Sequence, residues 1–470
     1  MRPVLQSLSR STRANLLVIF ILQTIAFLYF LITIPFHYDE AWTYLYFTGR
    51  GFLRTLTFYP IPNNHILYNL VAGLFDLLPF PPELTTRLPS YFSSLVATWY
   101  FFRIASLYFT EFTALITTAI FAAAYPVVLY SIEARGYSFV LCFTVLLLYA
   151  AVQLIREPGS RSHRYLYLFS LVAGMYSMPS FIYSAIVISG GLLVQYIIKK
   201  WPLKTLLSDH LKACLMIVLL YAPIVYFNGI DKLKNPVGFM RVTTTELTGQ
   251  LGLLLSAILH FLAGTDTLPL LALVLLIPAG IAFTRLGKEN SRFLVMVCMI
   301  MLISPVPILY LNPVLPYPRT WLYLIIPLAL LAGCLIAVVT SYRGRPEFPF
   351  ALTSALLLLI SVAGYRNFQL RHRQQYAIDY GIRSMFRKLA PDMGRIKSIG
   401  YTGTGLEFYV AEDLQFQCLK RHNAPRMDNS AAITNTEDVL VLTPGAAIPP
   451  SSYAAVGTDS VNYTLYLRKL

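Results

Sequence analysis

The stretch NLLVIFILQTIAFLYFLITIPFHYDE, residues 15–40, joins a long apolar run to four polar residues. The apolar part has the length of about 20 residues that an α-helix needs to cross a lipid bilayer. It ends in His37, Tyr38, Asp39 and Glu40, where a membrane span should give way to an aqueous loop. Ionisable residues are costly at a membrane and are therefore often functional there. The stretch predicts an integral membrane protein with chemistry at the bilayer surface.

The composition of the whole chain agrees with this class. Of its 470 residues, 56% are hydrophobic and 13% are charged, whereas soluble proteins have about 25% charged residues. The formal net charge of +15 could indicate a nucleic-acid partner. The basic residues gather beside apolar runs, however, as the positive-inside rule expects of membrane proteins. We therefore predict an α-helical polytopic membrane protein without a nucleic-acid partner.

Apolar runs of spanning length recur along the chain. We predict about 11 spans, near residues 15–36, 88–108, 112–132, 137–155, 164–179, 181–198, 211–229, 268–284, 292–311, 320–340 and 348–365. Basic loops at 156–164, 199–212, 285–292 and 343–345 place those loops and the N-terminus in the cytoplasm, and the loop 37–86 outside. The N-terminus lacks a small-residue cleavage site, so the first span is expected to stay uncleaved.

Two further apolar stretches have nearly spanning length. A span at 64–80 would invert the charge bias of every later loop, and prolines frame the stretch. We predict a juxtamembrane helix in the outer interface there. The stretch 247–264 is also placed in the interface, because a span would expose two basic loops. Basic residues after the last span favour the opposite choice, so both readings stay open.

From about residue 366 the chain becomes more polar. Residues 369–389 have a helix-like pattern, and β-rich runs follow at 396–401, 406–410, 438–442 and 463–467. We predict two domains: a transmembrane catalytic domain at 1–365 and a small extracytoplasmic α/β domain at 366–470.

The sequence contains no pattern typical of redox, metal or nucleotide sites. Four of its five cysteines lie in apolar spans, and the fifth stands alone in the polar tail. Walker loops, CxxC pairs and HExxH motifs are absent. No cofactor is predicted, and a divalent metal is left open without support from residue spacing.

Asp39 and Glu40 are the candidate catalytic residues. An acidic pair in a loop is most often simply solvated. At the end of a span, however, burial raises a carboxylate pKa toward values useful for a general base, unless a cation offsets it. We predict that Asp39 takes a proton from an acceptor and that Glu40 tunes the base or binds the acceptor.

Four basic residues on the same predicted side are candidates for binding a phosphate. His65, near the start of the stretch 64–80, either caps that helix or faces an anion at its N-terminus. Arg87, Arg135 and Arg319 lie at external span ends. One such arginine is usually an interface anchor, but three on the side of an acidic pair suggest bidentate contacts to phosphate oxygens.

Five short motifs, in this order, resemble the GT-C glycosyltransferases, most closely protein O-mannosyltransferases and the bacterial transferases that add aminoarabinose to lipid A. They are Tyr38-Asp39-Glu40, Pro62-Asn63-Asn64-His65-Ile66-Leu67-Tyr68, Thr86-Arg87-Leu88-Pro89-Ser90, Glu133-Ala134-Arg135-Gly136-Tyr137 and Tyr317-Pro318-Arg319. The resemblance covers mainly residues 10–160. It departs from the family at Ile66-Leu67, where the family has two prolines, and in the fourth motif, where several relatives carry an aspartate.

The resemblance implies a multi-span fold, an external active site and a donor sugar linked to a polyprenyl phosphate. It places Asp39 in the slot of the family's catalytic base. Residues expected to contact the acceptor or to support the site are Tyr38, Asn64, Glu133 and Tyr137. The implied partners are the donor lipid, the surrounding membrane lipids and a protein, lipid or glycan acceptor, in a bacterial plasma membrane.

Two other functions stay open. A transporter or lipid flippase would also be a polar helical bundle, but transporters typically carry ionisable groups near the bilayer midplane and repeated halves. Here the charges gather at span ends and no repeat is visible. An envelope polymer polymerase or ligase would differ mainly in its acceptor.

Overall fold

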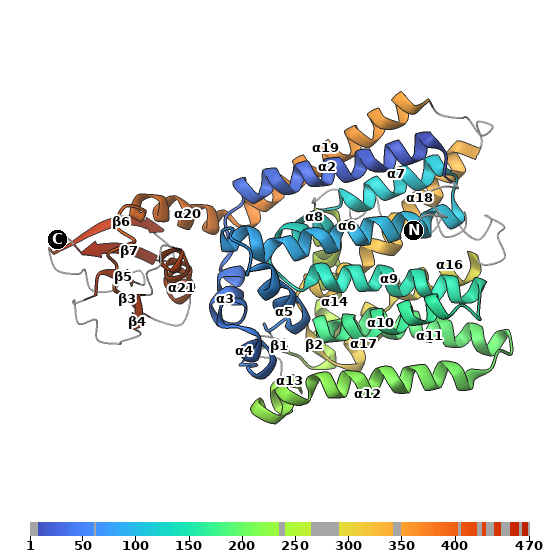
Figure 1. Ribbon diagram of the computed structural model, residues 1–470, viewed down its shortest axis with the longest axis horizontal. Coiled ribbons are helices and arrows are strands. Elements are labelled where there is room, and N and C mark those ends of the chain that lie inside the picture. Colours follow the sequence, from blue (N-terminus) through green and yellow to red (C-terminus); the bar gives the residue numbers. More distant parts are fainter. Residues whose placement is uncertain are drawn as a thin grey trace.

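The computed structural model describes residues 8–60, 63–234, 240–264, 291–341, 349–402, 406–420, 425–428, 437–442, 452–459 and 463–468. The chain forms a helical bundle followed by a smaller part with a sheet (Figure 1). The longer helices are α2 (Arg10–Thr33), α6 (Pro82–Tyr108), α7 (Glu111–Ala122), α8 (Tyr125–Ile132), α9 (Tyr137–Arg156), α10 (Arg161–Ser177), α11 (Ile182–Ile198), α12 (Leu203–Asn228), α14 (Thr244–Ala263), α16 (Ser291–Ile303), α17 (Pro305–Leu311), α18 (Ile325–Ser341) and α19 (Phe350–Gln375). The shorter elements of the bundle are α3 (Tyr38–Tyr46), η1 (Thr48–Arg50), α4 (Phe52–Thr57), α5 (Ile66–Phe75), η2 (Pro179–Phe181), α13 (Asp231–Lys234), β1 (Met240–Arg241), β2 (Val314–Leu315) and η3 (Pro318–Leu324).

Helices cover every predicted span that falls within the described residues, and the predicted span at 268–284 lies outside them. Two of these spans are bent, by 58° between α7 and α8 and by 50° between α16 and α17. A proline stands in the first turn of α8 and of α17. Proline is tolerated in a first turn, but it prevents the preceding helix from continuing straight through.

By length and hydropathy, seven of the described helices could cross a membrane, or nine if each bent pair counts as one span. The stretch predicted as a juxtamembrane helix forms α5, which has 10 residues and is too short to cross. The stretch 247–264 forms most of α14, whose 20 residues reach spanning length. Its length would allow a span, but both of its ends contact the segment that leads into η3: Thr248 hydrogen-bonds to Tyr310, and His260 lines a cavity together with Pro318. These contacts favour the interfacial placement expected from the loop charges.

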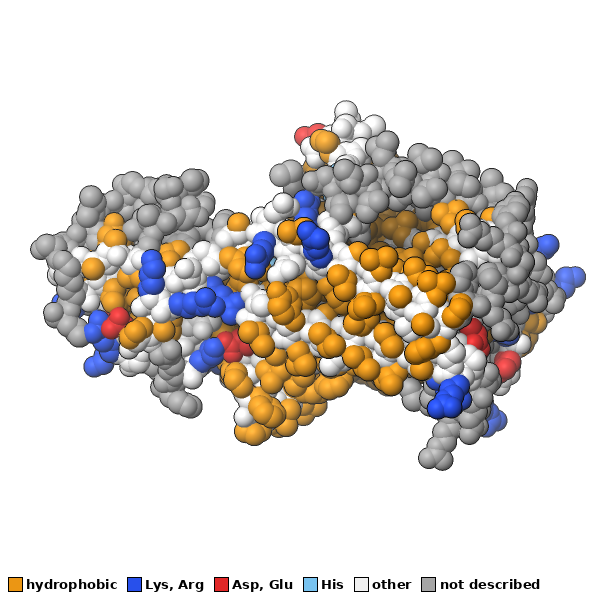
Figure 2. Space-filling model, turned by 90° about the horizontal axis from the view of Figure 1, so that it is seen from above, with side chains coloured by type: hydrophobic (Ala, Val, Ile, Leu, Met, Phe, Trp, Pro, Cys, Tyr) orange, Lys and Arg blue, Asp and Glu red, His pale blue; other side chains and the backbone are white. Residues whose placement is uncertain are grey.

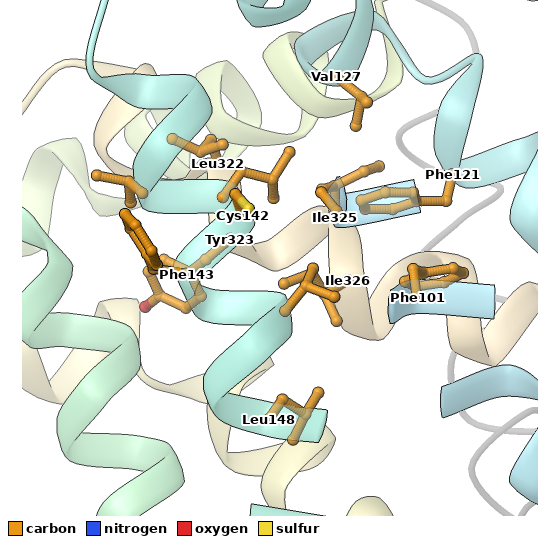
Figure 3. Packing of buried hydrophobic residues seen from close by; sticks show 14 of the residues in the cluster. Phe101, Phe121, Val127, Cys142, Phe143, Leu148, Leu322, Tyr323, Ile325 and Ile326 are labelled. Atoms are coloured by element: carbon orange, nitrogen blue, oxygen red, sulfur yellow. The ribbon is translucent and has the colours of Figure 1, made fainter. Parts of the chain in front are cut away.

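Helix α9 lies at the centre of the bundle. About 94% of its apolar stretch is buried, against 17% for the outer helices α12 and α19. Helices α6, α10 and α11 and the turn η3 contact it. Buried side chains of α6, α7, η3 and α18 fill the core beside it, among them Phe101 and Phe121, whose rings stack at 4.2 Å (Figure 3). Apolar side chains cover much of the outer face of the bundle, and basic side chains gather toward its two ends (Figure 2). This distribution is typical of lipid-facing helices between two aqueous interfaces.

The C-terminal part is an α/β unit. Its elements are α20 (Ala377–Leu389), β3 (Ser398–Tyr401), α21 (Leu406–Leu419), β4 (Arg426–Asp428), β5 (Val439–Leu442), β6 (Tyr453–Asp459) and β7 (Tyr463–Arg468). The sheet has the order β4-β3-β5-β7-β6, with β3 parallel to β4 and β5, and β7 antiparallel to β5 and β6. A separate apolar core joins the sheet to α20 and α21. The small α/β part expected from the sequence is confirmed.

Two details of the sequence prediction for this region are wrong. Residues 406–410, predicted as a strand, open helix α21. The residues of α21 that join the apolar core of the sheet follow helical spacing, which a window of five residues does not reveal: Val410, Ala411, Leu414 and Cys418. The single polar helix expected at 369–389 is instead two helices, because α19 continues to Gln375. The composition change at residue 366 thus falls inside a helix, and a domain boundary there stays a prediction.

Candidate active site

The acidic pair lies in the first turn of α3, directly after the first span. His37 is the N-cap residue: its Nδ1 accepts from the backbone N–H of Asp39 at 3.3 Å, and its own N–H donates to Glu40 Oε2 at 2.8 Å. Tyr38 begins the helix, with its ring 4.3 Å from the ring of Tyr409 in α21. Successive residues of a helix point about 100° apart. The two carboxylates therefore have different surroundings.

Glu40 is a buried structural anchor. Arg87 of α6 donates to it from Nε at 2.8 Å and from Nη2 at 2.6 Å, and both side chains are fully buried. The backbone N–H of Ala134 adds a third bond at 2.7 Å. Arg87 Nη2 also donates to the carbonyl of Pro35 at 2.9 Å. The pair therefore ties α3 to α6 and to the segment after α8.

This geometry differs from the roles expected for Glu40 and Arg87. The guanidinium fork of Arg87 already binds a carboxylate. Its remaining nitrogen, Nη1, is buried and has no hydrogen-bond partner among the described residues. An occupied, buried fork offers no bidentate face to a phosphate. The geometry favours a scaffolding role for both residues over catalysis and phosphate binding.

Asp39 faces two other arginines. Its Oδ2 lies 3.5 Å from Nη2 of Arg135 and 3.7 Å from Nη1 of Arg319, and 11% of its side chain is exposed. Burial raises the pKa of Asp39, but the positive charges of Arg135 and Arg319 oppose burial, and this pKa lies below its usual range. Asp39 is thus an anion at neutral pH. The arginine contacts are longer than the roughly 2.7–2.9 Å of a strong charge-assisted bond, which leaves the arginines able to bind a second anion.

The ring of Tyr137 orients both guanidinium groups. It lies 6.0 Å from Cζ of Arg135 and 5.6 Å from Cζ of Arg319. Arg319 also lies over the ring of Tyr317, at 4.6 Å. Cations are attracted to aromatic faces at these distances. Tyr137, expected from its motif to belong to the site, does lie within it.

His65 occupies the N-cap position of α5, but its side chain makes no cap bond. Instead, Nδ1 accepts from the backbone N–H of Gly136 at 3.0 Å, so the ring proton lies on Nε2. A Cβ on Gly136 would come within 2.7 Å of the His65 side chain, so this approach requires glycine. Burial, then Arg135 and Arg319, lower the pKa of His65 well below its ordinary value. His65 is a neutral donor.

Asn64 shapes the first loop. Its amide donates to the carbonyls of Thr55 and Phe58, at 2.8 and 2.9 Å, and its Oδ1 accepts from Asn69 at 2.9 Å. Both N–H donors are taken. The geometry therefore favours a structural role over contact with an acceptor.

Glu133 follows α8 and lies close enough to His37, Glu40, Arg135 and Asp39 to interact with each electrostatically. Its Oε1 is buried and has no hydrogen-bond partner among the described residues. Burial is the main cause that raises the pKa of Glu133 to about 7. The site therefore contains one carboxylate that is always ionised at neutral pH and a second that titrates there.

Two cavities lie near this group of charged residues, one lined by Tyr137 and the other by Arg319. The first, of about 290 Å³, is lined by His65, Tyr137 and Arg241 and by a mostly apolar wall that includes Leu233, Ile308, Leu309 and Trp321. The second, of about 390 Å³, is lined by polar and aromatic side chains that include Arg319, Arg371, His260, Gln375, Tyr125 and Tyr130. Within the described residues, no group of three or more His, Cys, Asp or Glu side chains could hold a metal ion.

Sequence reasoning did not identify Arg241, His260 and Arg371 as site residues. Arg371 left one signal. It belongs to the basic cluster after the last span, which the topology placed on the unexpected, external side. A basic residue that breaks the positive-inside pattern is a candidate for function, and Arg371 lines the second cavity.

No family model and no curated protein match the chain, but solved structures do. ArnT from Cupriavidus metallidurans bound to undecaprenyl phosphate has 11% identity and a TM-score of 0.60, over 95% of this chain and 97% of ArnT. Apo ArnT has 12% identity, a TM-score of 0.59 and the same coverage. AglB, the archaeal oligosaccharyltransferase from Archaeoglobus fulgidus in complex with an inhibitory peptide and a dolichol-phosphate, has 10% identity and a TM-score of 0.55, over 92% of this chain and 69% of AglB.

ArnT and AglB both have the GT-C architecture. This chain has the GT-C fold. The fold expected from the five motifs is thereby confirmed. Because GT-C proteins share this fold at identities near 11%, the recognition rested on the motifs of the first two aqueous loops rather than on overall similarity.

Removing one member of the Glu40–Arg87 pair should destabilise the protein. E40Q or R87A leaves a buried charge without its partner, at a typical cost of about 3–5 kcal/mol. We expect both variants to unfold at clearly lower temperature in detergent, while E40Q/R87M, which leaves no charge unpaired, should recover part of the loss. D392N, which alters a partly exposed ion pair with Arg395 in the C-terminal part, serves as the control that folds normally. An R87A variant of wild-type stability that fails to bind donor would restore the phosphate role.

Glu133 should make stability depend on pH. Its native pKa of about 7 exceeds the unfolded value of about 4.3, so the native state binds more protons between these values. The associated stability is complete below about pH 4 and is lost as pH rises through 7. As the pH is raised from 5 to 8, the thermal midpoint of E133Q should therefore rise relative to that of the wild type. An equal difference between the two proteins at both pH values would contradict the raised pKa.

Proposed function

We propose that this chain is a membrane glycosyltransferase. It would move a hexosyl or pentosyl group from a polyprenyl-phosphate-linked donor to an acceptor hydroxyl on the extracytoplasmic face of a bacterial plasma membrane. The observation that carries the proposal is the Asp39 carboxylate between Arg135 and Arg319 in a GT-C fold, with one cavity lined by Tyr137 and another by Arg319. The donor class is supported by ArnT and AglB, which were determined with undecaprenyl phosphate and dolichol-phosphate.

The cavity of about 290 Å³ suits the lipid-linked donor. Most of its wall is apolar, as a polyprenyl chain requires, and a few polar residues, among them His65 and Arg241, also line it. His65 presents an uncharged N–H donor there, next to the ring of Tyr137 at 5.4 Å. Arg135 and Arg319 lie on that ring. In this arrangement a donor phosphate would bind between His65 and the two guanidinium groups.

The chemistry would be a displacement at the anomeric carbon. Asp39 accepts the proton of the acceptor hydroxyl, the acceptor oxygen bonds to the anomeric carbon, and the bond from that carbon to the phosphate oxygen breaks. The polyprenyl phosphate leaves with the electron pair, and Arg135 and Arg319 stabilise its charge. When a phosphate binds these arginines, its negative charge partly offsets their positive charge, so that they attract Asp39 less strongly. The pKa of Asp39 should then rise, which makes Asp39 a better base in the loaded site.

The cavity of about 390 Å³ suits the acceptor. Arg319 connects it to Asp39, and Arg371 and His260 line it further out. Its tyrosines offer rings and hydroxyls of the kind that bind sugars. A wall with two arginines favours an acceptor that carries negative charge. The acceptor would thus reach Asp39 through the cavity that Arg319 lines, while the donor lipid occupies the other cavity.

A transporter or flippase is less well supported. The ionisable site residues lie at the end of the bundle where α3 and α5 are found (Figure 1), rather than midway along the long helices. Transporter sites typically lie near the midplane. The position at the end of the bundle is one that an enzyme acting at the membrane surface needs.

Asp39→Asn should abolish most transfer without unfolding the protein. The amide keeps the shape of the carboxylate but accepts no proton, so kcat should fall about 10²- to 10⁴-fold, the usual contribution of a general base. The assay is transfer from a lipid-linked sugar in detergent, with undecaprenyl phosphate binding measured in parallel. D392N, which alters a half-exposed carboxylate paired with Arg395, is the matched control. Full transfer by D39N would reject Asp39 as the base.

Arg135→Ala and Arg319→Ala should weaken donor use. Loss of one charge-assisted contact to phosphate costs about 1.5–3 kcal/mol, roughly ten- to more than a hundredfold in kcat/KM for donor. Lysine should rescue each only in part, because it lacks the planar fork. The matched control is R395A, which breaks an exposed pair in the C-terminal part. Wild-type kcat/KM for donor in both alanine variants would remove the phosphate role.

A further inference from the structure

Two helices of the C-terminal part contact the short segment that carries Asp39. Arg383 of α20 donates from Nη1 to the carbonyl of Thr33 and from Nη2 to that of Ile32, each at 2.8 Å. These carbonyls belong to the last turn of α2, and the last four carbonyls of a helix have no N–H partner within the helix. The guanidinium therefore caps the helix that leads into α3.

Helix α21 lies beside α3 (Figure 1) and holds both of its ends. At the first residue of α3, Tyr38 packs against Tyr409 with ring centroids 4.3 Å apart. At the last residue, the hydroxyl of Tyr46 donates to Glu412 Oε1 at 2.7 Å. The C-terminal part thus fixes where α3 begins and where it ends.

His37 connects the C-terminal part to the backbone of the candidate base. Its Nδ1 accepts from the N–H of Asp39 at 3.3 Å, so its proton lies on Nε2, which faces Asp379 Oδ2 of α20 at 3.8 Å. The ring also packs edge-on against Tyr376 at 5.1 Å. One imidazole therefore lies between a carboxylate of α20 and the first turn of α3.

The orientation of Asp39 depends on this imidazole for a physical reason. Helix α3 has nine residues, whereas isolated helices shorter than about 12–15 residues are marginal in water. Asp39 lies in the first turn, whose N–H groups have no partner within the helix. Loss of the cap would let this turn fray and move the Asp39 carboxylate away from its place between the two arginines.

We propose that His37 and Asp379 are positioning residues through which the C-terminal part holds Asp39 in its reactive orientation. The effect on catalysis rests on the proposed function; the effect on the order of α3 does not. The C-terminal part is then a component of the active centre rather than an appended module.

The first measurement is hydrogen exchange of the amides of residues 38–46 in the full-length protein in detergent. H37A removes the cap acceptor, and we expect exchange in the first turn of α3 to become about five- to tenfold faster, in line with the usual contribution of an N-cap. H37N supplies an amide oxygen that can cap the helix, so its exchange should stay near that of the wild type. D379A should give an intermediate increase. D392N, which lies just after the end of α20, should leave the exchange of residues 38–46 unchanged.

The second measurement is transfer from a polyprenyl-phosphate-linked sugar by the same variants. A displaced base should lower kcat about ten- to a hundredfold in H37A, since small misplacements have effects of this size, while KM for donor and the thermal midpoint stay close to those of the wild type. H37N should recover most of kcat.

The two measurements distinguish failure of the positioning role from failure of the proposed function. Unchanged exchange in H37A, or equal loss of kcat in H37A and H37N, would overturn the positioning role. A wild-type protein without any transfer activity would count against the proposed function alone, because the exchange series still decides whether His37 and Asp379 order α3.

Discussion

The buried ion pair of Glu40 and Arg87 determines the geometry of everything around it. Two charges with zero exposure are stable only where attraction and hydrogen bonds replace the lost water. Glu40 receives two bonds from Arg87, one from the N–H of His37 and one from the N–H of Ala134. These donors come from segments separated by 47 and 94 residues. One carboxylate thus joins the first loop, α6 and the second loop, and the positions of Asp39, His65 and Arg135 follow from that junction.

Neighbouring carboxylates have different roles here because their surroundings differ. Glu40 is fully buried and accepts hydrogen bonds at both carboxylate oxygens. The preceding residue, Asp39, lies 3.5 and 3.7 Å from two arginines and keeps 11% of its side chain exposed. Glu133 adds a third environment, with a pKa raised to about 7 by burial. Acids whose environments push their pKa values apart are typical of sites that transfer protons. The dipeptide Asp39-Glu40 alone does not reveal that its two carboxylates have different surroundings and different roles.

The fold was largely predictable because the bilayer imposes a length and a polarity on every span. Hydropathy located the spans, and the proline frame distinguished the short helix α5. The differences between prediction and structure share one cause, which is dependence on contacts between residues far apart in the sequence. Residues 406–410, the first five of α21, are predicted as a strand because only packing against α3 and the sheet reveals a helix there. For Arg87 the sequence predicts phosphate binding, because its partner Glu40 lies 47 residues away. The polar residues of the predicted external loops, in contrast, do lie together in the structure: Asp39, Arg135, Arg319 and His65.

Charge balance links the geometry to the direction of the proposed reaction. Glu40 and Arg87 cancel, His65 is neutral, and Glu133 is protonated below about pH 7, so Asp39 with Arg135 and Arg319 carries a net charge of about +1. A polyprenyl-linked phosphodiester carries about one negative charge and fits this site. Its product, a phosphate monoester, carries about 1.5 to 2. When Asp39 takes the proton of the acceptor, the site becomes about +2 and matches the new charge. The base and the phosphate site thus compensate each other in the same step, because both act on the same two arginines.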